Sequence, residues 1–145
     1  MYYQKYGLYL SKITDLEKTI LSCLLNDSNL MKNEKLTDDL FQENQKTWQF
    51  MKAFYKKYGC FDLTLMYNIV SNKYNYMGFV IELLDIECVP SSINYYINQL
   101  IATRQEEEKE TARINAIFGM ANDLVVRNIN TKQFKEKIDE MFKEN

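Results

Sequence analysis

The sequence contains no histidine, and this absence excludes several kinds of active site. Ser-His-Asp and Cys-His catalysis need an imidazole as general base, and His-ligated zinc sites and histidine pH switches need one as well. Glycine is also scarce, and the four glycines stand alone at Gly7, Gly59, Gly78 and Gly119, so the chain has no Walker-type phosphate loop and no dinucleotide-binding fingerprint. We therefore expect a protein without catalytic residues and without a cofactor.

The three cysteines, Cys23, Cys60 and Cys88, are odd in number and far apart. This spacing fits neither a disulfide framework nor a C-x-x-C metal knuckle, so we expect reduced, mostly packed thiols in a cytoplasmic protein. No apolar run approaches the roughly 18 residues of a membrane span, and the first residues lack the apolar core of a signal peptide. We expect no contact with a membrane.

Four glutamates, Glu106, Glu107, Glu108 and Glu110, form the one cluster that could suggest a metal site. Consecutive positions of a helix point in different directions, whereas a divalent cation needs several oxygen ligands around one point. We interpret the cluster as a solvated charged face and predict no metal site.

What the chain does contain favours helices. Only one proline and four glycines interrupt 145 residues, of which 46% are apolar, and β-sandwiches and barrels need more turns than this. The net charge of -2 supplies no overall attraction to nucleic acid, so no direct nucleic-acid binding is expected. We predict an all-α protein that is long enough for one compact core.

The first helix has a recognisable start signal. Thr14 followed by Glu17 is typical of a capping box and predicts a helix from Asp15 to about Asn26. Asp27 or Ser28 then offers a side-chain oxygen to cap a short second helix.

An aromatic stripe lies along a helix expected from about Asn44 to Tyr58, which Gly59 ends. Trp48, Met51 and Phe54 recur in it at helical spacing. A base-stacking platform would combine such a stripe with nearby cations, here Lys52, Lys56 and Lys57. A stripe at this spacing is more often buried, and we predict that it belongs to the core.

Short helices are also expected after Thr37, Asp62 and Gly78. Thr and Asp are common before a first helical residue because their oxygens accept hydrogen bonds from the free amides there. The polar stretch 71–76, SNKYNY, separates the last two of these helices.

The only proline, Pro90, predicts a break between helices, because it disfavours helix at the residue before it. Ser92 can then cap one long helix that runs to about Arg127 through a charged middle. After a turn at 128–130, Thr131 is expected to cap the last helix.

The expected helices form two parts. Residues 1–101 make a globular bundle of short helices, and residues 102–145 make a C-terminal helical hairpin for dimerisation within one structural unit. Two helices hide little apolar surface except against each other, so we expect a second copy to cover the hairpin, although the hairpin could instead fold back on the globular part. The predicted interface residues are Ile114, Ile117, Phe118, Ala121, Leu124, Val125, Phe134, Ile138, Met141 and Phe142.

Several segments occur in the order found in the N-terminal domain of DnaB-type replicative DNA helicases. The stretch LEKTILSCLLND resembles the family's first helix, which typically reads as an acidic residue and then A-V-L-G-A-L-L-L-D. Phe61, Asp62 and Leu63 resemble the family's apolar-Asp-apolar triplet, and VPSSINYYINQL is similar to its V-P-S-A-A-N-V-E-Y-Y-A segment. The resemblance covers the chain from about Asp15 to the end.

The resemblance implies a DnaB N-terminal-domain-like fold and a scaffold role in DNA replication. In the family this domain pairs through its hairpin, the pairs assemble as a trimer of dimers above the motor ring, and the collar recruits primase or a helicase loader into the primosome. The family's RecA-like ATPase domain is absent from this sequence. We therefore expect a non-catalytic protein-interaction and oligomerisation domain.

Two other functions stay open on the sequence. The chain could be a freestanding phage or plasmid adaptor or inhibitor that pairs with a host replicative helicase and controls its loading. Whether the native reading frame continues into a Walker motif would separate this function from a helicase domain. The chain could also be a small nucleic-acid-binding helical protein, whose binding would weaken steeply with salt.

Overall fold

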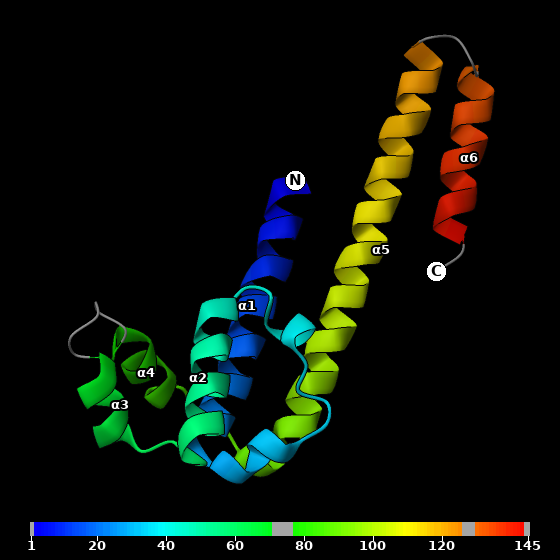
Figure 1. Cartoon of the computed structure of the whole chain (residues 1–145). Helices are drawn as coiled ribbons and strands as arrows, with labels where there is room; N and C mark the ends of the chain where they lie inside the picture. The colour runs from blue at the N-terminus through cyan, green and yellow to red at the C-terminus, as the bar shows by residue number, and fades with distance from the viewer. Residues whose placement is uncertain (1, 71–76, 126–129, 144–145) are drawn as a thin grey trace. The chain divides into compact units, whose positions relative to one another are not determined.

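The computed structural model describes the backbone of residues 2–70, 77–125 and 130–143, and these residues are helical apart from short connections. This confirms the predicted all-α class for the described residues. Six α-helices are present there, in the order shown in Figure 1: α1 Tyr2–Asn26, α2 Gln45–Tyr58, α3 Leu63–Val70, α4 Met77–Leu84, α5 Ile93–Val125 and α6 Thr131–Lys143. Three short 3-10 helices lie between them: η1 Ser28–Lys32, η2 Asp38–Phe41 and η3 Pro90–Ser92.

The chain divides into two compact units, Met1–Arg104 and Gln105–Asn145, and the long helix α5 contributes to both. The first unit contains α1 to α4 and the start of α5. The second contains the rest of α5 and α6. The functional division drawn from the sequence, with a globular part to residue 101 and a dimerisation hairpin after it, stays a prediction.

The hydrophobic core lies in the first unit. Helix α1 places Ile20, Leu21 and Leu24 on one fully buried face, which contacts α4 and the 3-10 turn η3. Phe41 of η2 stacks on Trp48 of α2, with 4.5 Å between the ring centroids. These contacts join segments from the whole length of the first unit around α1.

The aromatic stripe of α2 belongs to this core. Trp48, Met51 and Phe54 are buried, as predicted, so they cannot form a platform on which bases stack. Gly59 ends the helix in a left-handed conformation, with φ of 71°, and its amide donates to the Tyr55 carbonyl over 2.7 Å. The φ value explains why glycine follows this helix.

The capping box predicted at Thr14 was wrong. Helix α1 begins at Tyr2, so Thr14 lies inside it and its hydroxyl donates to the Leu10 carbonyl over 2.8 Å. A capping box needs free backbone amides at a helix start, and the amides after Thr14 are already inside the helix. Nothing between residues 2 and 13 is strong enough to stop the helix, since Gly7 alone costs only about 1 kcal/mol.

Glu17, the other half of that expected box, is instead a buried carboxylate with distant partners. Its two oxygens accept from the backbone amides of Glu43 and Asn44, and the Arg104 guanidinium donates to Oε2 over 2.6 Å. Arg104 also donates to the Asp39 carbonyl over 3.0 Å. Burial raises the pKa of Glu17, and the amide and Arg104 interactions oppose that rise. The arrangement holds three segments together: α1, α5 and the residues that precede α2.

Other start signals were read correctly. Asp27 caps η1 by accepting from the Asn29 amide over 3.2 Å, and the Asp62 carboxylate accepts from the Leu65 amide over 3.0 Å at the start of α3. Thr37 stands at the N-cap position of η2, although its side chain makes no capping hydrogen bond. The stretch 71–76 lies outside the described residues, and so does most of the turn predicted at 128–130.

The break at the only proline is confirmed. Helix α4 ends at Leu84, Val89 is extended with φ of -110°, and Pro90 is the first residue of η3. Helix α5 then starts at Ile93 and continues to Val125, as one long helix. Among the described helices, none combines the length and the apolar character that crossing a bilayer would need.

Candidate interaction surface

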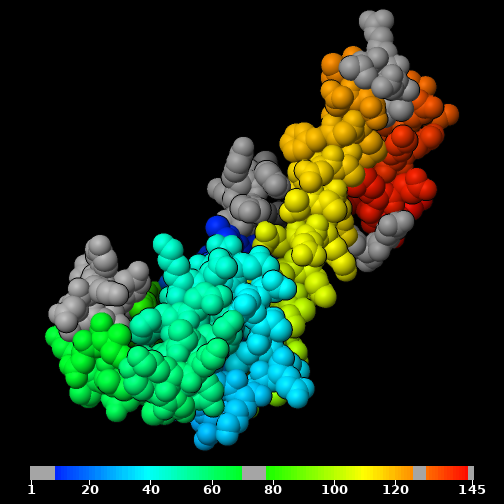
Figure 2. All heavy atoms as spheres, viewed as in Figure 1, coloured from blue at the N-terminus to red at the C-terminus, as the bar shows by residue number. Residues whose placement is uncertain are grey.

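The second unit is a pair of consecutive helices whose side chains contact each other, seen in yellow to orange (α5) and red (α6) in Figure 2. The start of α6 is fixed by a reciprocal capping box. The Asn130 side-chain oxygen accepts from the Gln133 amide over 2.8 Å, and the Gln133 side-chain oxygen accepts from the Asn130 amide over 2.9 Å. The cap is therefore Asn130, and the prediction of Thr131 was one residue too late.

None of the ten predicted interface residues is buried. The described residues of the second unit contain no buried side chain at all, because the buried residues of α5 end at Thr103 and α6 has none. Seven of the ten are half-buried: Ile114, Ile117, Ala121, Leu124, Phe134, Ile138 and Met141. The other three are exposed: Phe118 by 64%, Val125 by 79% and Phe142 by 58%.

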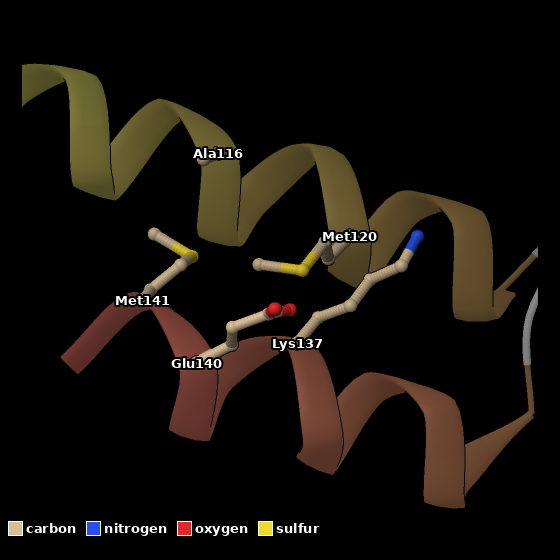
Figure 3. A pocket seen from close by; sticks show the side chains of 5 residues that line it. All are labelled: Ala116, Met120, Lys137, Glu140 and Met141. Atoms are coloured by element: carbon tan, nitrogen blue, oxygen red, sulfur yellow. The ribbon is translucent and has the colours of Figure 1, made fainter. Parts of the chain in front are cut away.

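One side of the hairpin carries a hollow of about 340 Å³ between α5 and α6. Figure 3 shows the side chains of Met120 and Met141 in the space between the two helices, with Ala116 beside them. Lys137 and Glu140 complete the lining. Met120 was not among the predicted interface residues, although it shares the apolar period of α5.

The hollow indicates which side of α5 is turned towards α6. Each residue turns an α-helix by about 100°, so Met120 and Leu124 point towards α6, with Ile117 close to the same direction. Ile114, Phe118, Ala121 and Val125 lie about a quarter turn away, on the side opposite Ala116. Their spacing of four, three and four residues is that of a heptad seam, the pattern by which one helix packs against a second, supercoiled helix.

Helix α6 extends this seam. Phe142 and Ile138 lie on the side of α6 away from Lys137 and Glu140, and therefore on the same side of the hairpin as Phe118. We call the six residues of this side the outer seam: Ile114, Phe118, Ala121, Val125, Ile138 and Phe142. The other predicted residues lie nearer the contact between α5 and α6.

The outer seam has charges of opposite sign at its two ends. Glu107 lies one heptad before Ile114, at the end of the hairpin away from the turn, and Lys135 lies one heptad before Phe142, near the turn. Glu110, half-buried beside Glu107, is 3.7 Å from Arg113. Sequence reasoning treated these glutamates only as a solvated face and gave Lys135 no role.

The residues that the structure describes contain no group of three or more Cys, Asp or Glu side chains placed to hold a metal ion. The glutamates 106 to 110 are all exposed or half-buried. The candidate site is the extended apolar face of the hairpin.

Comparison of the chain with protein-family models, with curated protein sequences and with solved structures found no match in any of the three.

Proposed function

We propose that this chain is a non-catalytic interaction module that pairs with a second copy of itself through the outer seam. The observation that carries the proposal is the exposure of Phe118, Val125 and Phe142 within a heptad-spaced apolar face. Burying an aromatic side chain contributes roughly 1.5–3 kcal/mol, and two copies would bury this set twice. A twofold axis allows one surface to cover itself, so no other partner is needed to explain the face.

The charges favour an antiparallel arrangement of the two hairpins. When two seams dock antiparallel, Lys135 of one copy lies opposite Glu107 of the other, and the same contact forms twice. A parallel arrangement would place Glu107 against Glu107 and Lys135 against Lys135. Charges at the rim of an interface select orientation more than they add affinity.

The biological setting that we propose is DNA replication, with the chain acting as the N-terminal collar domain of a replicative helicase. The support is the ordered resemblance of the segments around Leu16, Asp62 and Pro90, together with an all-α fold that ends in a hairpin. In this setting the dimer would dock primase or a helicase loader, and dimers could assemble further into a trimer of dimers.

Light scattering after size-exclusion chromatography tests the pairing. The parent chain, of 17.3 kDa, is expected to run at twice that mass at high micromolar concentration. Phe118→Asp should run as a monomer, because a charge placed in the interface loses the aromatic contact and is desolvated without a partner, a loss of about 3 kcal/mol or more. Ala112→Asp adds the same charge on the side of α5 away from the outer seam and should leave the dimer intact. A monomeric parent chain would remove the proposal.

Charge exchange tests the orientation. Lys135→Glu should weaken the dimer at low salt, and Lys135→Glu combined with Glu107→Lys should restore it, because the double change rebuilds the pair with its signs exchanged. If Lys135→Glu leaves the dimer unweakened, or if the double variant does not restore it, the antiparallel arrangement is wrong, although the seam itself could still be the interface.

The helicase setting has its own test. Purified replicative helicase, primase and helicase loader from the source cell can each be passed over the immobilised chain in a biosensor. Saturable binding of at least one of them, retained by Ala112→Asp, is expected. If all three fail to bind while the chain is dimeric, the module belongs to another system.

A further inference from the structure

We infer that Cys23 and Cys88 form an oxidation-sensitive thiol pair that can close into a disulfide between α1 and the loop before Pro90. Each thiol lies close to the residue adjacent to the other cysteine. Cys88 Sγ is 3.4 Å from Oγ of Ser22, the residue next to Cys23, and Cys23 Sγ is 3.9 Å from the carbonyl oxygen of Val89, the residue next to Cys88. Both thiols are free in the structure.

Cys88 is the more exposed of the two thiols and therefore the one that reacts first. The Ser22 hydroxyl donates its only proton to the Leu83 carbonyl over 2.7 Å, so towards Cys88 it can only accept. The Asn26 amide donates to the Ser22 carbonyl over 2.8 Å and to Cys88 Sγ over 3.7 Å. These contacts hold Cys88 Sγ against α1, beside the residue next to Cys23. Cys88 is also only partly buried, so a small oxidant can reach it.

Cys23 is suited to the second step only. It is completely buried, and burial, with the neighbouring Cys88 thiol as the next cause, raises its pKa to about 12. It therefore stays protonated and does not react with an oxidant from solution. It becomes useful only once Cys88 has been converted into an electrophile beside it.

The chemistry with hydrogen peroxide as oxidant balances in two steps. The Cys88 sulfur attacks one peroxide oxygen, the O–O bond breaks, and the departing hydroxide takes up the thiol proton as water, which leaves a sulfenic acid. The Cys23 sulfur then attacks the Cys88 sulfur, the S–OH bond breaks, and the hydroxide leaves as water with the Cys23 proton. Two thiols and one peroxide thus give one disulfide and two waters.

The bond would have a mechanical consequence. It would link α1 covalently to the loop that follows α4 and leads through Pro90 into α5. Closing a long loop between residues 23 and 88 reduces the freedom of the unfolded chain, so the oxidised protein should melt at a higher temperature.

Peptide mapping by mass spectrometry tests the pair in the full chain. The background variant is Cys60→Ser, because Cys60 is exposed and would otherwise form links between molecules. After peroxide treatment of the folded protein we expect a cross-linked peptide that joins residues 23 and 88, and a raised Tm that a reducing agent reverses.

Two further variants separate the steps. With Cys23→Ala, Cys88 should stop at the sulfenic acid and be captured by dimedone, whereas with Cys88→Ser the buried Cys23 should stay unmodified. No 23–88 cross-link under conditions in which dimedone labels Cys88 would overturn the pairing. No modification of Cys88 at all, or faster modification of Cys23, would overturn the assigned order of reaction.

Discussion

At the scale of single residues, Glu17 is the side chain with the most consequences for the fold. It is 0% exposed, and both of its oxygens face donors: two backbone amides and the Arg104 guanidinium. A proton on either oxygen would point at one of these donors. The carboxylate is therefore ionised at neutral pH although burial raises its pKa.

Glu17→Gln should destabilise the first unit by about 2–4 kcal/mol, because it leaves the Arg104 charge without its partner and turns an amide NH₂ group towards backbone donors. Urea unfolding followed by circular dichroism measures the loss. Arg104 is 17% exposed, so water can partly solvate it, and this places the effect below that of a fully enclosed pair.

The control is the double variant Glu17→Gln, Arg104→Met. Since the second change removes the unpaired charge, the double variant should lose less stability than the sum of the two single changes. Additive losses would mean that Glu17 and Arg104 act independently.

The contribution of Asp38 to stability can be tested through its dependence on pH. Hydrogen bonds from Lys52 over 2.8 Å and from the Trp48 ring nitrogen over 2.7 Å lower its pKa below the usual 3.8. A lowered pKa stabilises the fold above the unfolded value, and this contribution is lost as the pH falls through the folded value. The difference in Tm between the parent and Asp38→Asn should therefore be present at pH 6 and shrink steadily below about pH 4. A difference that stays constant down to pH 2 would show that the Asp38 charge is not involved.

At the scale of elements, the start of α6 depends on a local device. Asn130 and Gln133 satisfy each other's amides, and α6 has no buried residue that could hold it in place instead. A helix of this length is marginal without packing. The capping hydrogen bonds should therefore contribute more to the stability of α6 than they would to that of a buried helix.

Asn130→Ala should cost about 1 kcal/mol of α6 stability. Faster amide hydrogen exchange in the first turns of α6, with unchanged exchange in α1 and α2, is the expected result. Thr131→Ala alters the neighbouring position, which sequence reasoning had chosen as the cap, and should have the smaller effect. Equal effects of the two changes would argue against the capping role of Asn130.

At the scale of the whole molecule, burial is unevenly divided between the two units. Every buried residue of the described chain lies in Met1–Arg104, and the described part of Gln105–Asn145 has only half-buried and exposed side chains. Helices as short as those of the hairpin gain most of their stability from packing. The two units should therefore behave differently when they are produced separately.

A fragment of residues 1–104 should unfold cooperatively and run as a monomer, because it keeps the core and the Glu17–Arg104 pair. A fragment of residues 105–145 should be largely unfolded when dilute and gain helix as its concentration rises, because association supplies the missing contacts. Circular dichroism at 222 nm over a wide concentration range measures both. Helix content of the second fragment that does not depend on concentration would contradict self-association.

Much of the fold followed from rules that act within a few residues. The 3.6-residue period located α2 and the long α5, Gly59 and Pro90 marked where helices break, and Asp62 capped α3, because periodicity and capping depend only on neighbours within about four positions. The same rules failed at Thr14, where a local pattern matched a capping box but the preceding residues continued the helix.

The sequence by itself determined the helical class, the break at the proline and the apolar period of the last two helices. Only the tertiary structure decided that Glu17 meets the amides of Glu43 and Asn44 and the guanidinium of Arg104, and that Phe118 and Val125 stay uncovered while Trp48 does not. The physical reason is that burial and long-range pairing depend on residues far apart in the chain, whereas a helix and its caps depend on adjacent ones.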